Sequence, residues 1–263
     1  METTTGYLEH NGGRLYWEAA GAGQPVVFVH GFSLDTTMWD DQWQPFAEHY
    51  RVIRYDCRGF GKSTTPSGPY SHMDDIAALL DAQGVERAHI VGLSMGARIA
   101  CDFALAYPQR TAKLVLLDGS PSGATPSPAF AEFNAKLREN VKAGHLNSTK
   151  EMWVKGDLFA PACRSNELRG RLRTIVHNWS GWHWFSTDPA IPLDPPAMQR
   201  LADLPETLYL YGELDMPSVH EAAAAIAAGA PKAKVIAIPD TGHMANMEAP
   251  AQVNAALLEF LAT

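Results

Sequence analysis

A serine between two glycines, in the sequence GLSMG at 92–96, is the feature of this chain that most directly predicts chemistry. The pattern G-x-S-x-G places a serine on a sharp turn between a strand and a helix, and the glycines leave room around its hydroxyl. Here an apolar run at 88–93 precedes Ser94, and a helical pattern at 95–108 follows it. We therefore predict that Ser94 is a nucleophile held in a strained backbone conformation.

A serine nucleophile needs a base to take its proton and a carboxylate to orient that base. In a parallel sheet, the residues that follow the carboxyl ends of the strands meet at one edge. Asp215 follows an apolar run at 207–212, and His243 follows another at 234–240. We predict that His243 is the base and Asp215 the acid, so that the three residues occur in the order serine, acid, histidine.

Two other carboxylates compete with Asp215 for the role of the acid. Asp118 ends the apolar run before the central part of the chain, and Glu213 lies two residues before Asp215. The sequence favours Asp215 over Glu213, which is closer to the strand, and it leaves Asp118 open. His220 falls inside a predicted helix, which favours a surface position over a catalytic one.

The elements that must position these side chains alternate along both ends of the chain. Two strands are expected first, around the tight turn Asn11-Gly12-Gly13. Apolar runs typical of buried strands then recur at 25–30, 51–56, 88–94, 113–118, 207–212 and 234–240. Helical patterns separate them at 38–48, 72–84, 95–108, 218–229 and 248–261. This alternation predicts a mostly parallel eight-stranded sheet with right-handed crossovers and helices on both faces.

The middle of the chain breaks the alternation, because no buried strand is expected between the two halves of the sheet. Helices are predicted there instead, near 127–144, 148–158, 165–178 and 194–203. We therefore predict a sheet domain formed by 1–120 and 205–263, and an inserted helical cap, or lid, formed by 121–204. An insertion at this point of the topology lies above the sheet edge that carries Ser94.

Aromatic and methionine side chains are predicted to form an apolar substrate pocket over that edge. Three of them are tryptophans of the insertion: Trp179, Trp182 and Trp184. Their rings could instead attach the insertion to the sheet domain, and the sequence leaves both roles open. Met216 and Met244 flank the expected site and would add adaptable apolar surface.

Together these motifs resemble the α/β-hydrolase superfamily, and within it the group of small esterases, enol-lactonases, cofactor-free perhydrolases and carbon–carbon bond hydrolases. The matching segments are HGF at 30–32, DCRGFGKS at 56–63, GLSMG at 92–96, GELD at 212–215 and GHM at 242–244. They cover both halves of the sheet domain, and the insertion matches no single activity. The resemblance implies the α/β-hydrolase fold and a reaction that needs neither a cofactor nor a metal.

The resemblance also implies an oxyanion hole made of two backbone N–H groups, those of Phe32 and Met95. In the same family the histidine at position 30 has a structural role, holding the loop. Carbon–carbon bond hydrolases often have asparagine before the nucleophile, whereas this chain has Leu93, which disfavours that activity without excluding it. Haloalkane dehalogenases and epoxide hydrolases are disfavoured because their nucleophile is aspartate at the position of Ser94.

Composition narrows the expected partners and location. The formal charge of −8 argues against nucleic acid, since binding to phosphates relies on Lys and Arg. The three cysteines are scattered, without the Cys/His spacing of a zinc site, and no apolar run reaches the length of a membrane span. The first residues lack the pattern of a secretory signal. We expect a cytoplasmic monomer or homodimer that binds a small molecule, with no membrane partner.

These inferences lead to one function and two alternatives. We predict a serine hydrolase that cleaves a carboxylic ester or lactone of a medium-sized, largely apolar molecule through an acyl-enzyme. The first alternative is a perhydrolase or a carbon–carbon bond hydrolase that uses the same triad. The second is a non-catalytic ligand receptor built on a hydrolase scaffold, because fold alone does not decide function.

Overall fold

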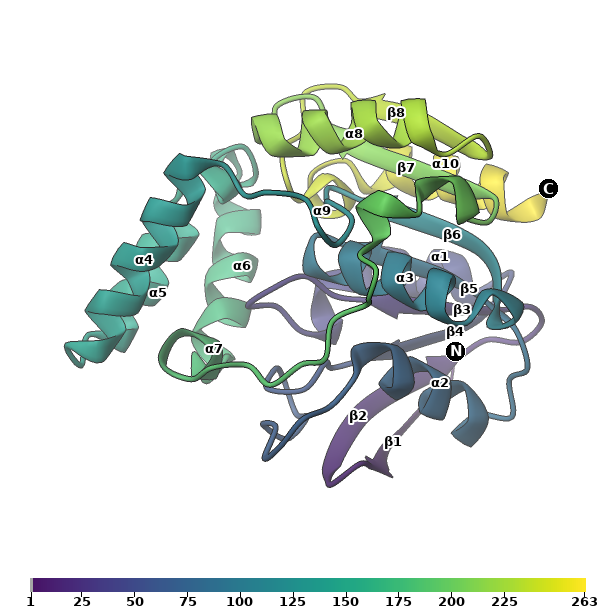
Figure 1. Cartoon of the computed structure of the whole chain (residues 1–263), viewed down its shortest axis with the longest axis horizontal. Coiled ribbons are helices and arrows are strands. Elements are labelled where there is room, and N and C mark those ends of the chain that lie inside the picture. The colour runs from purple at the N-terminus through teal and green to yellow at the C-terminus, as the bar shows by residue number, and fades with distance from the viewer. Residues whose placement is uncertain (1) are drawn as a thin grey trace.

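The computed structural model describes residues 2–263, and a single eight-stranded sheet lies at its centre (Figure 1). The strands are β1 (Thr3–His10), β2 (Gly13–Ala20), β3 (Pro25–Val29), β4 (Arg51–Tyr55), β5 (Ala88–Leu93), β6 (Thr111–Leu117), β7 (Thr207–Gly212) and β8 (Ala233–Ile238). Their order is β1-β2-β4-β3-β5-β6-β7-β8. Only the pairs β1·β2 and β2·β4 are antiparallel. The predicted mostly parallel sheet is confirmed.

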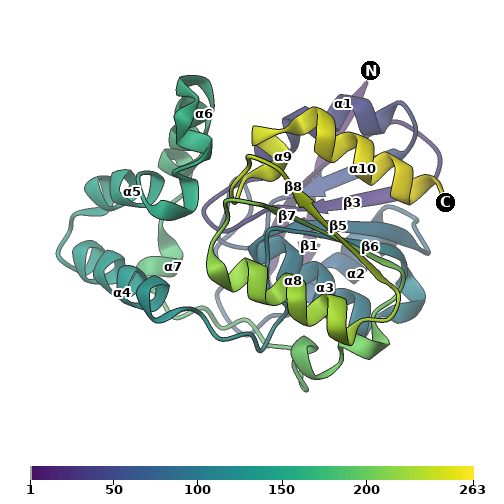
Figure 2. The same ribbon diagram turned by 90° about the horizontal axis from the view of Figure 1, so that it is seen from above.

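Helices cover both faces of this sheet. They are α1 (Asp40–Ala47), α2 (His72–Ala82), α3 (Met95–Ala106), α8 (Pro217–Gly229), α9 (Ala245–Glu248) and α10 (Pro250–Ala262). Figure 2 shows α1 and α10 on one face, and α2, α3 and α8 on the other. Within residues 2–263, no helix combines the length and the apolar content that crossing a bilayer requires.

The burial of the central strands explains why they are short apolar runs. Every residue of β5 is buried, and so are all but the first residue of β3. Strands covered by helices on both faces have no solvent-facing side, so their sequence does not alternate. At the edge, the first hairpin turns at Asn11 and Gly12, whose φ angles of 44° and 69° match the predicted tight turn.

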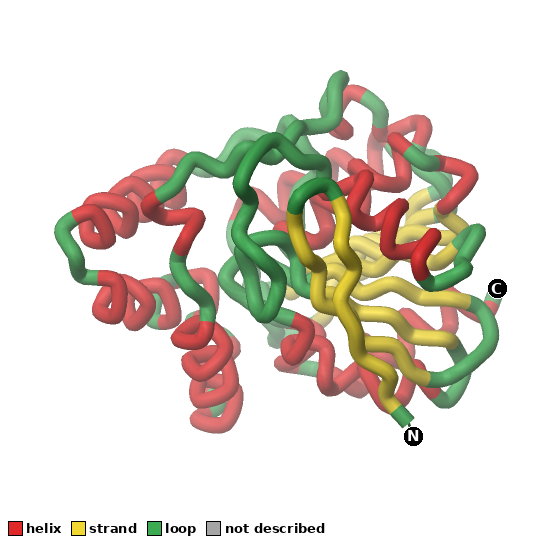
Figure 3. Tube along the Cα trace, turned by 90° about the horizontal axis from the view of Figure 1, so that it is seen from below, coloured by secondary structure: helices red, strands yellow, loops and turns green. Residues whose placement is uncertain are grey.

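Between β6 and β7 the chain leaves the sheet and forms four helices. They are α4 (Pro128–Lys142), α5 (Leu146–Val154), α6 (Asn166–Asn178) and α7 (Trp182–Phe185). Figures 1 and 2 show this inserted segment gathered beside the sheet domain, and Figure 3 shows the loops that join the two parts.

One predicted helix of the inserted segment, at 194–203, is wrong. Only two short 3-10 turns form there, at Ala197–Gln199 and Leu201–Asp203. Pro195 and Pro196 supply no N–H and restrict the residues before them, so helical bonding begins only at position 197. The four-residue helix α7 went unpredicted, since it is too short to have a periodicity.

Two buried histidines make the stability of the fold depend on pH. Burial is the main cause that lowers the pKa of His89 and of His183 to about 4. Each ring is therefore neutral in the folded protein at pH 7, whereas in the unfolded chain it titrates near 6.5. Because the unfolded state binds more protons between pH 6.5 and pH 4, each histidine lowers stability as the pH falls through that window.

Replacing His89 with glutamine should therefore reduce the acid sensitivity of the fold. Between pH 7 and pH 4.5 the wild type should lose about 2 kcal/mol of unfolding free energy through this ring, and the variant should not. Urea unfolding at a series of pH values measures the difference between the two slopes. His49→Gln, at an exposed position, is the control and should leave the slope unchanged. Parallel slopes for wild type and His89→Gln would contradict the prediction.

Candidate active site

Ser94 lies on the sharp turn between β5 and α3. Its φ and ψ of 56° and −114° fall in a region that residues with a side chain rarely adopt, at a cost of about 1–3 kcal/mol. A Cβ atom on Gly92 would lie 2.1 Å from the Gly96 carbonyl oxygen, and one on Gly96 would lie 2.1 Å from that of Val29. The glycines of the motif are therefore required by the close approach of the backbone on either side of the serine.

A continuous chain of hydrogen bonds joins the three predicted side chains. The hydroxyl of Ser94 lies 2.8 Å from Nε2 of His243. Nδ1 of His243 lies 3.0 and 2.9 Å from the two carboxylate oxygens of Asp215. Because a carboxylate only accepts, Nδ1 carries the proton and Nε2 is free to accept from the serine hydroxyl. The side chains of His243 and Asp215 are 5% and 1% exposed, so little water competes for these bonds.

The loops after β7 and β8 bring the acid and the base together. Asp215 follows β7 and also accepts the N–H of Met216 at 2.7 Å. The carboxylate of Glu248, in α9, accepts the N–H groups on both sides of His243, at 2.9 Å from Gly242 and 3.1 Å from Met244. Glu248 thus fixes the backbone of the loop that carries His243. Sequence reasoning missed this role, because an acidic residue near the start of a helix is common.

The two rival carboxylates have other partners. Asp118 is fully buried, and its oxygens accept the N–H groups of Gly212 at 2.7 Å and Ala245 at 3.3 Å. Burial, and then the charge of Asp215, raise the pKa of Asp118 well above its usual range. Glu213 is exposed and accepts the N–H of Asp240 at 3.4 Å. Of the three candidates, the structure places Asp215 against the imidazole.

The backbone around Phe32 and Met95 is arranged to leave two N–H donors free. Met95 is the first residue of α3, where N–H groups have no partner within the helix. Across residues 2–263, neither N–H donates to another protein group. His30 holds the Phe32 loop: its Nε2 accepts the N–H of Cys57 at 2.9 Å, and its Nδ1 lies 2.8 Å from the Gly31 carbonyl oxygen.

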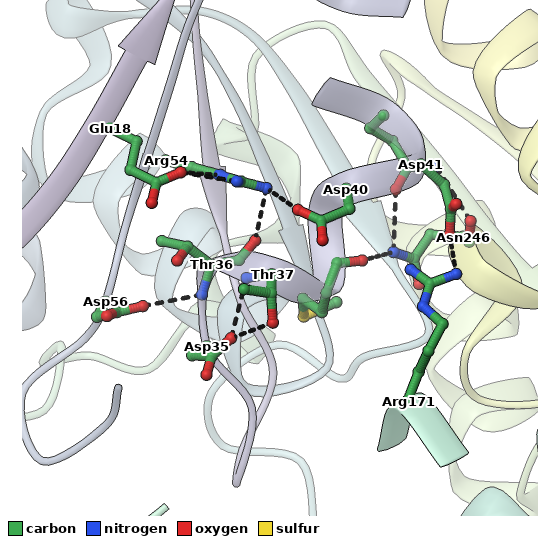
Figure 4. Close-up of polar contacts among 12 residues, drawn as sticks. Glu18, Asp35, Thr36, Thr37, Asp40, Asp41, Arg54, Asp56, Arg171 and Asn246 are labelled. Atoms are coloured by element: carbon green, nitrogen blue, oxygen red, sulfur yellow. Dashed lines mark hydrogen bonds and ion pairs between the residues drawn. The ribbon is translucent and has the colours of Figure 1, made fainter. Parts of the chain in front are cut away.

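The segment that follows this loop is fixed by a polar network around the buried Arg54 and Asp56 (Figure 4). The N–H of Thr36 donates to Asp56 at 2.8 Å, and its carbonyl oxygen accepts from Arg54 at 3.0 Å. The guanidinium of Arg54 also contacts Glu18 at 2.7 Å and Asp40 at 2.6 Å. The aspartate of the DCRGFGKS segment therefore helps to position the loop of the oxyanion hole.

A cavity of about 320 Å³ opens next to Ser94 and His243. Of the predicted pocket residues, Trp184, Met216 and Met244 line it. Sequence reasoning missed most of its other large side chains: Phe130, Trp153, Leu158 and Phe159. All four are apolar residues of the inserted segment, but nothing in the sequence indicated which apolar residues of that segment face the cavity. The cavity is largely apolar, with Arg138 as the only lysine or arginine among the described lining residues.

Two predicted pocket residues, Trp179 and Trp182, lie outside that lining. The indole N–H of Trp179 donates to the Gly59 carbonyl oxygen at 3.1 Å, and its ring stacks on Phe60 at 5.6 Å between centroids. Trp182 packs edge-on against His183, at 4.8 Å. Trp179 therefore contacts the DCRGFGKS segment from the inserted segment. An ion pair between Arg171 of α6 and Asp41 of α1, at 2.9 Å, is a further contact of the inserted segment (Figure 4).

The chemistry that this arrangement can perform is acyl transfer. Within residues 2–263, no group of three His, Cys, Asp or Glu side chains is placed to hold a metal ion. The cysteines are unpaired, and burial raises the pKa of the Cys57 and Cys101 thiols, which makes them poor nucleophiles. An imidazole that contacts the serine hydroxyl, and a carboxylate that orients this imidazole, are the groups that activate a serine as a nucleophile.

Comparison with known proteins agrees with this geometry. The model of the alpha/beta hydrolase family matches residues 26–256. This chain belongs to the α/β hydrolase family. It is 29% identical over 261 residues to a 2-hydroxy-6-oxononadienedioate/2-hydroxy-6-oxononatrienedioate hydrolase of Comamonas testosteroni, with 95% of this chain and 91% of the relative covered. The resemblance predicted from the motifs, and the fold that it implied, are confirmed.

Two solved structures extend the comparison. A thermophilic esterase from Thermogutta terrifontis is 30% identical and superposes with a TM-score of 0.84, covering 100% of this α/β hydrolase and 98% of the esterase. Est816, described as an N-acyl homoserine lactone degrading enzyme, is 28% identical with a TM-score of 0.77, covering 97% and 100% of the two chains. The proteins similar to this α/β hydrolase therefore include a hydrolase of 2-hydroxy-6-oxo dioic acids, an esterase and a lactone-degrading enzyme.

Proposed function

We propose that this α/β hydrolase is a serine hydrolase that cleaves carboxylic esters or lactones of medium-sized, largely apolar molecules. The observation that carries the proposal is the hydrogen-bond chain from Ser94 through His243 to Asp215, which opens into an apolar cavity. The esterase and the lactone-degrading enzyme among the similar structures support the same substrate class.

Each step of the reaction follows from these contacts. The Ser94 oxygen attacks the substrate carbonyl while His243 takes the hydroxyl proton, and Asp215 stabilises the imidazolium that forms. The N–H groups of Phe32 and Met95 bind the negative charge on the carbonyl oxygen. His243 then gives its proton to the leaving alcohol, which departs and leaves the acyl group on Ser94. A water molecule, activated by His243, releases the acid and restores the serine.

The cavity and the inserted segment support a substrate of modest size. A volume of about 320 Å³ is at the lower end of ligand pockets, and its apolar walls suit an acyl chain or a ring better than a charged group. We propose that 121–204 acts as a cap, because Phe130, Trp153 and Trp184 of this segment form part of the cavity wall.

Carbon–carbon bond hydrolysis is the second candidate. It is supported by the relative from Comamonas testosteroni, whose name describes a substrate with two carboxylates. Arg138, which lines the cavity, is a cation that could pair with such a carboxylate. Carbon–carbon bond hydrolases often have asparagine before the nucleophile, and this chain has Leu93 there, which weighs against this candidate.

A substrate panel separates the candidates. We expect kcat/KM for p-nitrophenyl esters to rise by about 10²-fold from acetate to hexanoate, since each added methylene contributes about 0.8 kcal/mol when the cavity buries it, and to fall for dodecanoate. An aliphatic lactone should be hydrolysed, and a 2-hydroxy-6-oxo-dienoate should be a poor substrate. Turnover of the dienoate at a far higher kcat/KM than any ester would favour carbon–carbon bond hydrolysis. Ligand-dependent thermal stabilisation without turnover of any substrate would favour a receptor.

A further inference from the structure

A buried hydrogen bond joins the inserted segment to the loop that carries the Phe32 N–H. The indole N–H of Trp153, in α5, donates to Oγ of Ser33 at 2.7 Å. The two residues are 2% and 0% exposed, so water does not compete for the bond. Ser33 follows Phe32 directly, so a group that fixes Ser33 restrains the chain one residue after the Gly31–Phe32 peptide, which carries the Phe32 N–H.

The backbone of Ser33 needs such support. Its φ of 65° lies in the left-handed region, which a residue with a side chain keeps only when its surroundings hold it there. From the sheet domain, the N–H of Leu34 donates to the Gly31 carbonyl oxygen at 3.3 Å, and the N–H of Gly31 contacts the Met38 sulfur at 3.2 Å. These bonds hold the backbone on both sides, whereas the bond from Trp153 holds the side chain of Ser33.

The ring of Phe32 is enclosed by the same inserted segment. Its centroid lies 5.8 Å from that of Trp153 and 5.0 Å from that of Trp179, both in edge-on contact. The ring of Trp184 lies 6.4 Å away. The side chains of Phe32 and Ser33 therefore both meet the inserted segment, and Phe32 also lines the cavity next to Ser94.

We propose that Trp153 is a positioning residue for the oxyanion hole. Its indole N–H holds Ser33 and thereby aims the Phe32 N–H at the carbonyl oxygen of the reacting substrate. The inference rests on the proposed function, since it needs a reaction in which that oxygen becomes negative. It assigns the inserted segment a part in the chemical step in addition to its place in the cavity wall.

Three variants test this role: Trp153→Phe, Ser33→Ala and the double variant. Phenylalanine keeps an aromatic ring and removes the donor, while alanine removes the acceptor without changing a residue that lines the cavity. Loss of a whole oxyanion donor costs about 10²–10³ in rate, so misplacing one should lower kcat for p-nitrophenyl acetate by roughly tenfold or more. In Ser33→Ala, which leaves the cavity wall unchanged, KM should change by less than about threefold, because the lost contact acts in the transition state.

The double variant and a second ligand separate positioning from general stability. If the bond itself acts, the double variant should be no slower than the slower single variant, because each change removes the same contact. A boronic acid that mimics the tetrahedral intermediate should bind more weakly by a factor similar to the loss in kcat. Trp17→Phe is the matched control: Trp17, in β2, neither lines the cavity nor belongs to the rings that contact Phe32, so this variant should keep the wild-type kcat.

The outcomes distinguish this inference from the proposed function. An active wild type with unchanged kcat and boronate affinity in Ser33→Ala would overturn the role of Trp153 alone. Multiplying effects in the double variant would overturn it as well. A wild type that neither hydrolyses the ester nor reacts with a fluorophosphonate would overturn both proposals. If Trp153→Phe does not fold, Ser33→Ala still decides the question, because it leaves the ring of Trp153 in place.

Discussion

Replacing Ser94 with alanine is expected to lower kcat for p-nitrophenyl acetate by about 10⁴–10⁶, down to the level that binding and the oxyanion hole alone supply. The loss is large because the variant has no hydroxyl to form the acyl-enzyme, and His243 has no proton to take. Initial rates at high enzyme concentration measure the residual activity. The melting temperature should stay close to that of the wild type, since the strained backbone conformation is the same for alanine.

Ser148→Ala is the control for this change. Ser148 is an exposed serine of α5, so its variant should keep both wild-type activity and wild-type stability. Hydrolysis by Ser94→Ala at a rate within a few-fold of the wild type would remove the nucleophile from the mechanism, whatever the geometry of the turn.

Replacing Asp215 with asparagine should lower kcat by about 10⁴ with little loss of stability. The amide would present an N–H group to Nδ1 of His243, so the ring would adopt the other tautomer and Nε2 could no longer accept the proton of Ser94. Steady-state kinetics and thermal unfolding of the same preparation measure the two effects.

Asp118→Asn should lower stability more than kcat. Comparing this variant with Asp215→Asn shows which aspartate is the acid. The Asp118 carboxylate accepts two buried N–H groups, of Gly212 and Ala245, whereas an amide has only one oxygen. The variant should therefore lose about 1–3 kcal/mol of stability, while kcat of the folded enzyme falls far less than in Asp215→Asn. The reverse pattern, with Asp118→Asn the slower enzyme, would make Asp118 the acid.

The sheet domain could be predicted because its signals are local. A strand buried on both faces is a short apolar run, so β3, β5 and β7 were found close to their observed bounds. The candidate catalytic residues follow the carboxyl ends of such strands, which a parallel sheet brings to one edge. The turn at Ser94 added a glycine pattern that the backbone contacts explain.

The inserted segment could not be predicted to the same depth, because contacts between distant residues decide its details. Trp153 meets Ser33, and Trp179 meets Gly59, in each case across 120 positions. Amino-acid type marks these tryptophans as buried, but it does not say whether they face the cavity or the sheet domain. For the same reason the sequence did not distinguish Trp184, which lines the cavity, from Trp179, which does not.

Covalent labelling with a fluorophosphonate, followed by peptide mass mapping, tests most directly whether the three side chains act together. The reagent forms a stable adduct only with a serine that a neighbouring base activates. We predict one adduct, on Ser94, that is absent from Ser94→Ala and forms far more slowly in His243→Ala. An adduct on another residue, or a Ser94 adduct that forms equally fast without His243, would contradict the account.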